Sequence, residues 1–106
     1  MGYAQRGVSA PPEVAFNTAT DPDRISAWLP EPLLSADPDR DGDVQRLRAR
    51  WGARHDDWSA ELWVEPADAG GCWLRLELGG GDEADRLADE ALTNLAREVA
   101  DNLQAG

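Results

Sequence analysis

Residues 82–103 constrain the fold most, because they predict a long amphipathic helix in a short chain. The segment contains neither glycine nor proline, and its apolar residues recur at helical spacing. Three glycines precede it and mark its start, and the acidic residues of its first turn suit the helix dipole. The apolar stripe consists of Leu87 or Ala88, Leu92, Leu95, Ala96, Val99 and Leu103. Such a stripe needs an apolar surface to cover it, which the preceding residues must supply.

Three segments before this helix alternate between apolar and polar residues, which is typical of strands with one buried face. The clearest are residues 58–65 and 72–78, and residues 66–71 between them have the composition of a hairpin loop. A third segment, residues 44–51, alternates arginines with apolar residues and ends at Gly52. A short helix is the alternative for this third segment, but its alternation favours a strand.

The polar faces of these strands complement one another in charge. The arginines at 46, 48 and 50 are expected beside Glu61 and Glu65, where opposite charges on antiparallel neighbours are favourable. Trp63 is expected to stack either on Trp73 or beneath an arginine. The expected structure is an antiparallel meander whose apolar inner face is covered by the C-terminal helix. This is a two-layer α+β fold.

The N-terminal third predicts a short edge strand at residues 3–9 and then two short helices between residues 11 and 29. Ser9, followed by two prolines, is a helix-start signal with Ser9 as the capping residue. Asp21 and Pro22 repeat the same device, with Asp21 as the cap. Pro30 and Pro32 end the second helix. Residues 31–36 have the pattern of a further short strand.

Length and charge restrict the class of protein. A chain of 106 residues suggests one domain, residues 1–106, with room for one core. A net charge of −11 makes nucleic acid and anionic membrane surfaces poor partners. No apolar run has the length of a signal peptide core or a membrane span, so we expect no membrane insertion. A single cysteine excludes an internal disulfide and fits the cytoplasm, and we expect no cofactor.

Three stretches resemble the START-like (SRPBCC) superfamily, which includes polyketide cyclases and dehydrases, lipid-transport proteins and birch-pollen-allergen-like proteins. Residues 9–30 are similar to its opening, where a strand leads to a Pro-rich helix start and a second helix carries Asp-Pro and then Trp. Residues 64–78 look like its late hairpin and residues 82–103 like its gripped helix. The matching residues of the opening are Pro11, Pro12, Val14, Phe16, Asp21, Pro22 and Trp28.

This resemblance implies a helix-grip fold, in which an antiparallel sheet wraps around a long C-terminal helix and two short helices lie near the N-terminus. It also implies an apolar cavity between sheet and helix. Members bind lipids, sterols, polyketides or other hydrophobic molecules, and some catalyse cyclisation or dehydration. This chain departs from the pattern in being short, with few middle strands, which bears on the size of any cavity.

The apolar inward residues are the candidate ligand-binding set. They line a pocket, with tryptophan supplying flat walls and an N–H group, or they fill the core. The short chain favours a filled core or a small pocket. The set consists of Trp28, Leu33, Trp51, Trp58, Leu62, Leu74, Leu76, Leu92, Leu95 and Val99.

The leading hypothesis is therefore a non-catalytic protein that binds or carries a small hydrophobic molecule. One alternative is an interaction or regulatory module with a closed core. The other is a polyketide cyclase-type enzyme, against which the scarcity of inward titratable residues counts.

Residues 37–44 match the first positions of an EF-hand calcium loop, with carboxylates at Asp37, Asp39 and Asp41 and a glycine at Gly42. The twelfth position is Arg48 rather than a bidentate glutamate, so the ligand count falls short. These aspartates are a weak metal candidate.

Two further features carry alternative interpretations. His55 is followed by Asp56 and Asp57. This histidine could serve as a general base or a metal ligand, but we expect the segment to be an exposed turn. Trp63 and Trp73 on the outer sheet face are either a homodimer contact or a pair shielded by arginine stems. Cys72 is expected to be a buried, small apolar residue.

Overall fold

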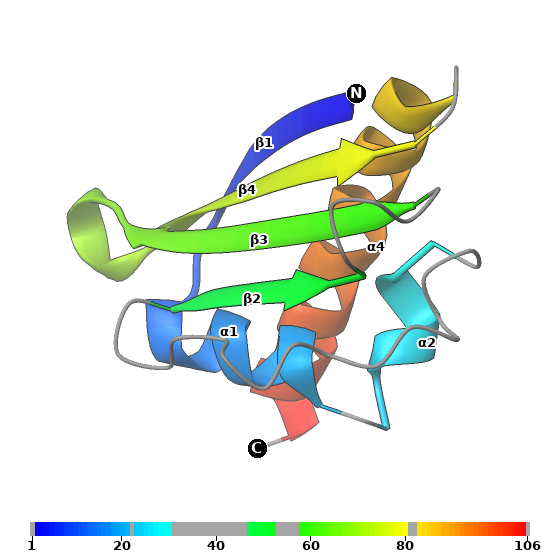
Figure 1. The fold of residues 1–106 in the computed structure, drawn as a ribbon. Helices are drawn as coiled ribbons and strands as arrows, with labels where there is room; N and C mark the ends of the chain where they lie inside the picture. Colours follow the sequence, from blue (N-terminus) through cyan, green and yellow to red (C-terminus); the bar gives the residue numbers. More distant parts are fainter. Residues whose placement is uncertain (1, 22, 31–46, 53–57, 81–82, 106) are drawn as a thin grey trace.

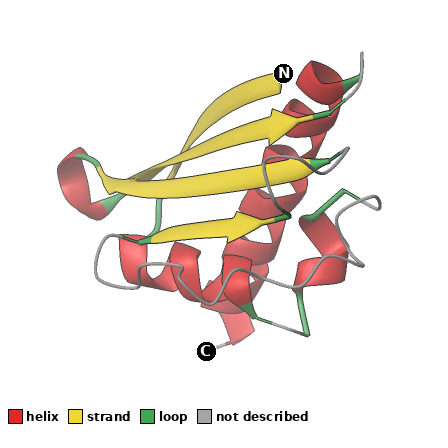
Figure 2. Cartoon of the chain, viewed as in Figure 1, coloured by secondary structure: helices red, strands yellow, loops and turns green. Residues whose placement is uncertain are grey.

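The computed structural model describes residues 2–21, 23–30, 47–52, 58–80 and 83–105, and these residues form two layers. A sheet is one layer, and the helices lie together against one face of it, with α4 crossing the sheet obliquely (Figures 1 and 2). The elements are β1 (Gly2–Val8), α1 (Pro12–Thr20), α2 (Ile25–Trp28), β2 (Arg48–Trp51), β3 (Ser59–Pro66), the 3₁₀ turn η1 (Asp68–Gly70), β4 (Cys72–Gly79) and α4 (Ala84–Ala105). The predicted α+β fold is confirmed.

The sheet has four described strands in the order β1-β4-β3-β2, and every neighbouring pair is antiparallel. Strands β2, β3 and β4 form the predicted meander, and β1 adds to the far side of β4. Leu62 of β3 pairs with Leu76 of β4, and Gly2 of β1 pairs with Leu78. This register places Leu62, Leu74, Leu76 and Leu78 on one face, which is the face toward the helices, and Tyr3, Trp63 and Trp73 on the other.

The hairpin between β3 and β4 turns through η1, as the glycine-rich loop predicts. Ala69 and Gly70 both have positive φ, of 62° and 81°. Glycine adopts this conformation without strain, whereas Ala69 has a Cβ and adopts it at some cost. The Ala67 N–H then bonds to the Gly71 carbonyl at 2.9 Å and closes the loop.

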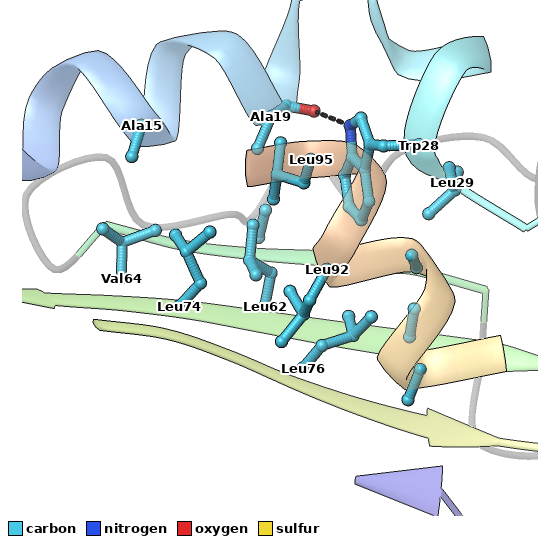
Figure 3. Packing of buried hydrophobic residues seen from close by; sticks show 14 of the residues in the cluster. Ala15, Ala19, Trp28, Leu29, Leu62, Val64, Leu74, Leu76, Leu92 and Leu95 are labelled. Carbon is cyan, nitrogen blue, oxygen red and sulfur yellow. Dashed lines mark hydrogen bonds between the residues drawn. The ribbon is translucent and has the colours of Figure 1, made fainter. Parts of the chain in front are cut away.

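The core lies between the inner face of the sheet and one stripe of α4. Figure 3 shows Leu92 and Leu95 of α4 lying over Leu62, Leu74 and Leu76 of the sheet. All five side chains are buried, as are Ala84, Ala88, Ala91 and Val99 on the same side of α4. Burying one leucine contributes about 1.5–3 kcal/mol, so this interface accounts for much of the stability.

Leu103 was expected in the stripe, and this expectation is wrong. Its side chain is 43% exposed. The last turns of α4 extend beyond the sheet (Figure 1), and there the Asn102 Nδ2 donates to Thr18 Oγ1 of α1 at 3.0 Å. Leu103 therefore keeps the helical period but has no sheet beneath it.

The expected cap of α1 is also wrong. Pro11, not Ser9, precedes the helix, and no side chain caps it. Pro12 has no N–H to be capped, and the N–H groups of Val14 and Ala15 bond to the Pro11 carbonyl at 3.1 and 3.2 Å. The first turn of α1 therefore forms without a hydrogen bond from a serine side chain.

The end of the second helix agrees with expectation, but its expected cap is wrong. Arg24 rather than Asp21 is the residue before α2, and no side chain caps the helix. Asp21 Oδ1 instead accepts the Asp23 N–H at 2.9 Å in the turn that leads into α2. The helix ends at Trp28, because Leu29 takes the extended conformation that a following proline favours. The expectations for residues 22, 31–36 and 44–46 lie outside the described residues.

We expect Leu95→Ala to lower the free energy of unfolding by about 2–5 kcal/mol, because it leaves a cavity between α4 and the sheet. Leu103→Ala is the matched control on the same helix and should change stability by less than about 0.5 kcal/mol. Urea denaturation followed by circular dichroism measures both. Similar losses for the two variants would contradict the placement of α4.

Candidate functional site

A groove of about 410 Å³ runs between α2 and α4. Residues 26–30, from α2 and the segment after it, form one wall, and one side of α4 forms the other. The second wall includes Leu87, Glu90, Ala91 and Asn94. Apolar side chains lie beside polar ones in the lining, so the groove suits an apolar molecule that also carries a polar group.

Trp28 forms the floor of this arrangement and is held from two sides. Its Nε1 donates to the Ala19 carbonyl of α1 at 3.2 Å (Figure 3). Its ring packs edge-on against Trp51, with the ring centroids 5.4 Å apart and the planes at 78°. This T-shaped contact is a favourable geometry for two aromatic rings. The pair joins α2 to the end of β2.

Trp51 is 1% exposed, and its Nε1 has no hydrogen-bond acceptor in the described part of the chain. Its cross-strand partner is Ala60, and the preceding inward residue of β2 is Ala49. Neither side chain carries an acceptor. The Trp51 indole N–H is thus a buried donor without an acceptor in the described part of the chain.

Arg24 ties the turn before α2 to the C-terminal half of α4. Its Nη1 lies 3.3 Å from Glu98 Oε1 and 3.1 Å from Asp101 Oδ2. The hydrogen bond with Asp101, together with the charges of Asp101 and Glu98, raises the pKa of Arg24. The guanidinium therefore remains a cation that positions α2 against α4.

The candidate ligand-binding set is divided by the structure. Trp28 lines the groove, whereas Trp51 is buried against the Trp28 ring without lining it. The remaining members that the structure describes as buried in the core are Leu62, Leu74, Leu76, Leu92, Leu95 and Val99. Trp58 differs from both groups, because it is half-buried and covers Gly80 at the end of the sheet. Leu33 lies outside the described residues.

Several groove residues were not found from the sequence. Leu29, Pro30, Leu87, Ala91 and Asn94 line the groove, but none had been placed in the binding set. The three-residue spacing from Ala91 to Asn94 indicates that they share one side of a helix. The sequence pattern does not show which element packs near this side of α4, because that depends on how α2 docks.

The outer sheet face is polar, with aromatic rings among the charges. Glu61 pairs with both Arg48 and Arg50, the latter at 3.1 Å, and these carboxylate contacts border a cleft of about 520 Å³ that also includes Ser59 and Glu77. The Arg48 guanidinium lies 5.3 Å from the centre of the Trp63 ring. Of the two expected arrangements for Trp63, the structure has the arginine one.

Trp73 has a different environment on the same face. In the sheet register it lies opposite Glu65 and Gly7, while Trp63 lies opposite Arg75. A Cβ on Gly7 would meet the Trp73 ring at 3.3 Å, so the ring rests over the glycine. The Trp73 side chain is nevertheless 43% exposed.

Cys72 is buried at the start of β4, as expected. Burial raises the pKa of its thiol, and the negative charge of Glu13 adds to the effect. A thiol with a raised pKa stays protonated at neutral pH and is a poor nucleophile.

The polar candidates at Asp37, Asp39 and Asp41 and at His55, Asp56 and Asp57 lie outside the described residues. Within the described ranges, no three His, Cys, Asp or Glu side chains are grouped so that they hold a metal ion. No helix among the described residues has the length and apolar character needed to cross a membrane.

Comparison with known proteins identifies the fold. No family model and no curated protein matches the sequence. Among solved structures, TTHA0849 from Thermus thermophilus is similar over 95% of this chain and 97% of its own, with 15% identity and a TM-score of 0.61. Ara h 8.0201 is similar over 98% and 97%, with 12% identity and a TM-score of 0.59.

A third similar structure is StfQ, a di-domain aromatase/cyclase (ARO/CYC) from the steffimycin biosynthetic pathway. The similarity covers 95% of this chain but 44% of StfQ, with 19% identity and a TM-score of 0.62. The same arrangement of sheet and long C-terminal helix therefore recurs in proteins of very different sequence. The chain therefore has the helix-grip fold.

Proposed function

We propose that the protein binds, or carries, a small hydrophobic molecule in the groove between α2 and α4. The observation that carries this proposal is the groove, whose lining residue Trp28 packs against the buried Trp51. Flat aromatic walls favour flat or ring-containing apolar ligands. The groove is open to solvent along α2, so a ligand enters without disturbing the packed leucines between α4 and the sheet.

We propose a binding role rather than a catalytic one. Thr18 is the one buried polar side chain among the described residues, and both its donor and acceptor capacities are used, by Val14 and Asn102. Cys72 is protonated and buried. A cyclase-type enzyme needs an acid or base next to its substrate, and the described core offers none. This alternative rests on the likeness of fold to StfQ.

We propose the cytoplasm as the compartment. A single buried cysteine needs no oxidising environment and suits a reducing one.

A second proposal concerns the outer sheet face, where we propose that two copies of the chain associate weakly. This face carries Trp73, Trp63 and Tyr3. Three arginines, at positions 48, 50 and 75, and three glutamates, at positions 61, 65 and 77, lie among these rings. Its charges therefore balance, although the whole chain carries −11. Two copies approach through this face with less repulsion than through the acidic remainder.

The groove proposal is tested with N-phenyl-1-naphthylamine, a neutral probe that fluoresces in apolar surroundings. We expect saturable binding to the wild type and an affinity at least about tenfold lower for Ala27→Trp, because Ala27 is an exposed residue of the groove wall. Ala100→Trp, at an exposed position of α4 that does not line the groove, is the matched control. Equal binding by all three proteins would place the probe elsewhere and contradict the proposal.

The non-catalytic role predicts an unreactive Cys72. At pH 8, alkylation by iodoacetamide should be far slower for the native protein than for the urea-unfolded chain, as mass spectrometry measures. Because the folded thiol has the raised pKa, its contribution to stability is complete below the unfolded pKa, about 8.5, and is lost as the pH rises above that value. Cys72→Ala should remove this part of the pH dependence. Fast native alkylation at pH 8 would favour a nucleophilic role.

The association proposal predicts that Trp73→Ala weakens dimer formation in sedimentation equilibrium. Trp73 is the more exposed of the two tryptophans on the outer face, and truncation removes its contact area. Leu103→Ala, which removes an equally exposed apolar side chain from α4, should leave association unchanged. A wild type that stays monomeric at every concentration would refute the proposal.

A further inference from the structure

The Trp51 N–H is a buried donor without a partner in the described part of the chain. Native proteins pair nearly all buried polar groups, because an unpaired donor loses its hydrogen bonds to water and gains nothing in return. Trp51 is 1% exposed, so solvent does not reach its N–H and cannot supply the missing acceptor. An unpaired N–H at such a place calls for an explanation.

The two adjacent indoles differ in this respect. The Trp28 N–H is satisfied by the Ala19 carbonyl at 3.2 Å. The Trp51 N–H has no acceptor in the described part of the chain, and neither its cross-strand partner Ala60 nor the preceding inward residue Ala49 carries one on its side chain. A phenylalanine at position 51 would supply the same apolar ring face without an unpaired donor. The indole therefore lowers the stability of the fold unless some group accepts a hydrogen bond from its N–H.

Trp28 connects this donor to the groove, because Trp28 lines the groove and its ring contacts Trp51, which is not itself a lining residue. A bound molecule therefore reaches the Trp51 N–H only if its inner end passes Leu29 and Trp28, both of which are buried. An oxygen at that end is the acceptor that the protein does not provide.

We infer that the ligand of the α2–α4 groove is an apolar molecule with one hydrogen-bond acceptor, such as a ketone oxygen, and that Trp51 donates its N–H to that oxygen. The inference rests on the proposed function and adds the ligand class and the residue that selects it. A hydrocarbon of the same shape leaves the donor unpaired and binds more weakly, because a site built to hydrogen-bond rejects an analogue without the partner group.

The test uses fluorene and 9-fluorenone, which share a flat ring system and differ at one carbon. Each displaces N-phenyl-1-naphthylamine from the wild type, from Trp51→Phe and from Trp63→Phe. We expect the wild type to prefer fluorenone by about tenfold, the size of one net hydrogen bond of about 1.4 kcal/mol. Trp51→Phe should bind the two equally and keep its affinity for fluorene. Trp63→Phe removes an indole from the outer face and should keep the preference.

A second measurement does not depend on the variants folding. In ¹⁵N-labelled wild type, fluorenone should shift the Trp51 indole N–H proton resonance downfield, while fluorene should not. If fluorene binds but fluorenone shows no preference and no such shift, the inference is wrong and the groove proposal stands. If neither compound nor the naphthylamine probe binds, the groove proposal itself is wrong and the inference with it.

Discussion

Burial of one side of α4 against the inner face of the sheet is the interaction on which the rest of the structure depends. Leu92 and Leu95 lie over leucines from β3 and β4, and these side chains are removed from water, as is Val99. The other helices attach to this pair of layers, since α1 and α2 both pack on α4. The opposite side of α4 carries many of the acidic residues, which keeps the strong negative charge in solvent and away from the core.

The groove depends on the least secure of these attachments. A four-residue helix such as α2 has no stability of its own, so its position depends on what holds it. The Trp28 N–H anchors it to α1, the Trp28 ring anchors it to Trp51, and Arg24 anchors the preceding turn to α4. A wall held by a few specific contacts adapts to a guest more readily than the leucine core does, which suits a binding site.

Periodicity in the sequence predicted the main layers because each strand and α4 has one buried side. Leu62 and Leu76 were placed correctly for that reason. Leu103 was not, because a period continues whether or not a neighbouring element lies beneath it. Ser9 was misassigned because two prolines can begin a helix without a side-chain cap. The groove was missed because it depends on how α2 and α4 dock, and the T-shaped contact of Trp28 with Trp51 depends on where β2 ends.

The pairing of β1 with β4 has a consequence for how the chain reaches this structure. Strands β3 and β4 are joined by a short turn, so their hairpin closes locally and early. Gly2 pairs with Leu78 and lies against the backbone of Ala84, so β1 joins only after a long intervening segment has been made. During synthesis β1 is made before the β3–β4 hairpin with which it pairs, so it has no strand partner until that hairpin has been made. Completion of the sheet is thus a late, long-range step, and it coincides with the arrival of α4.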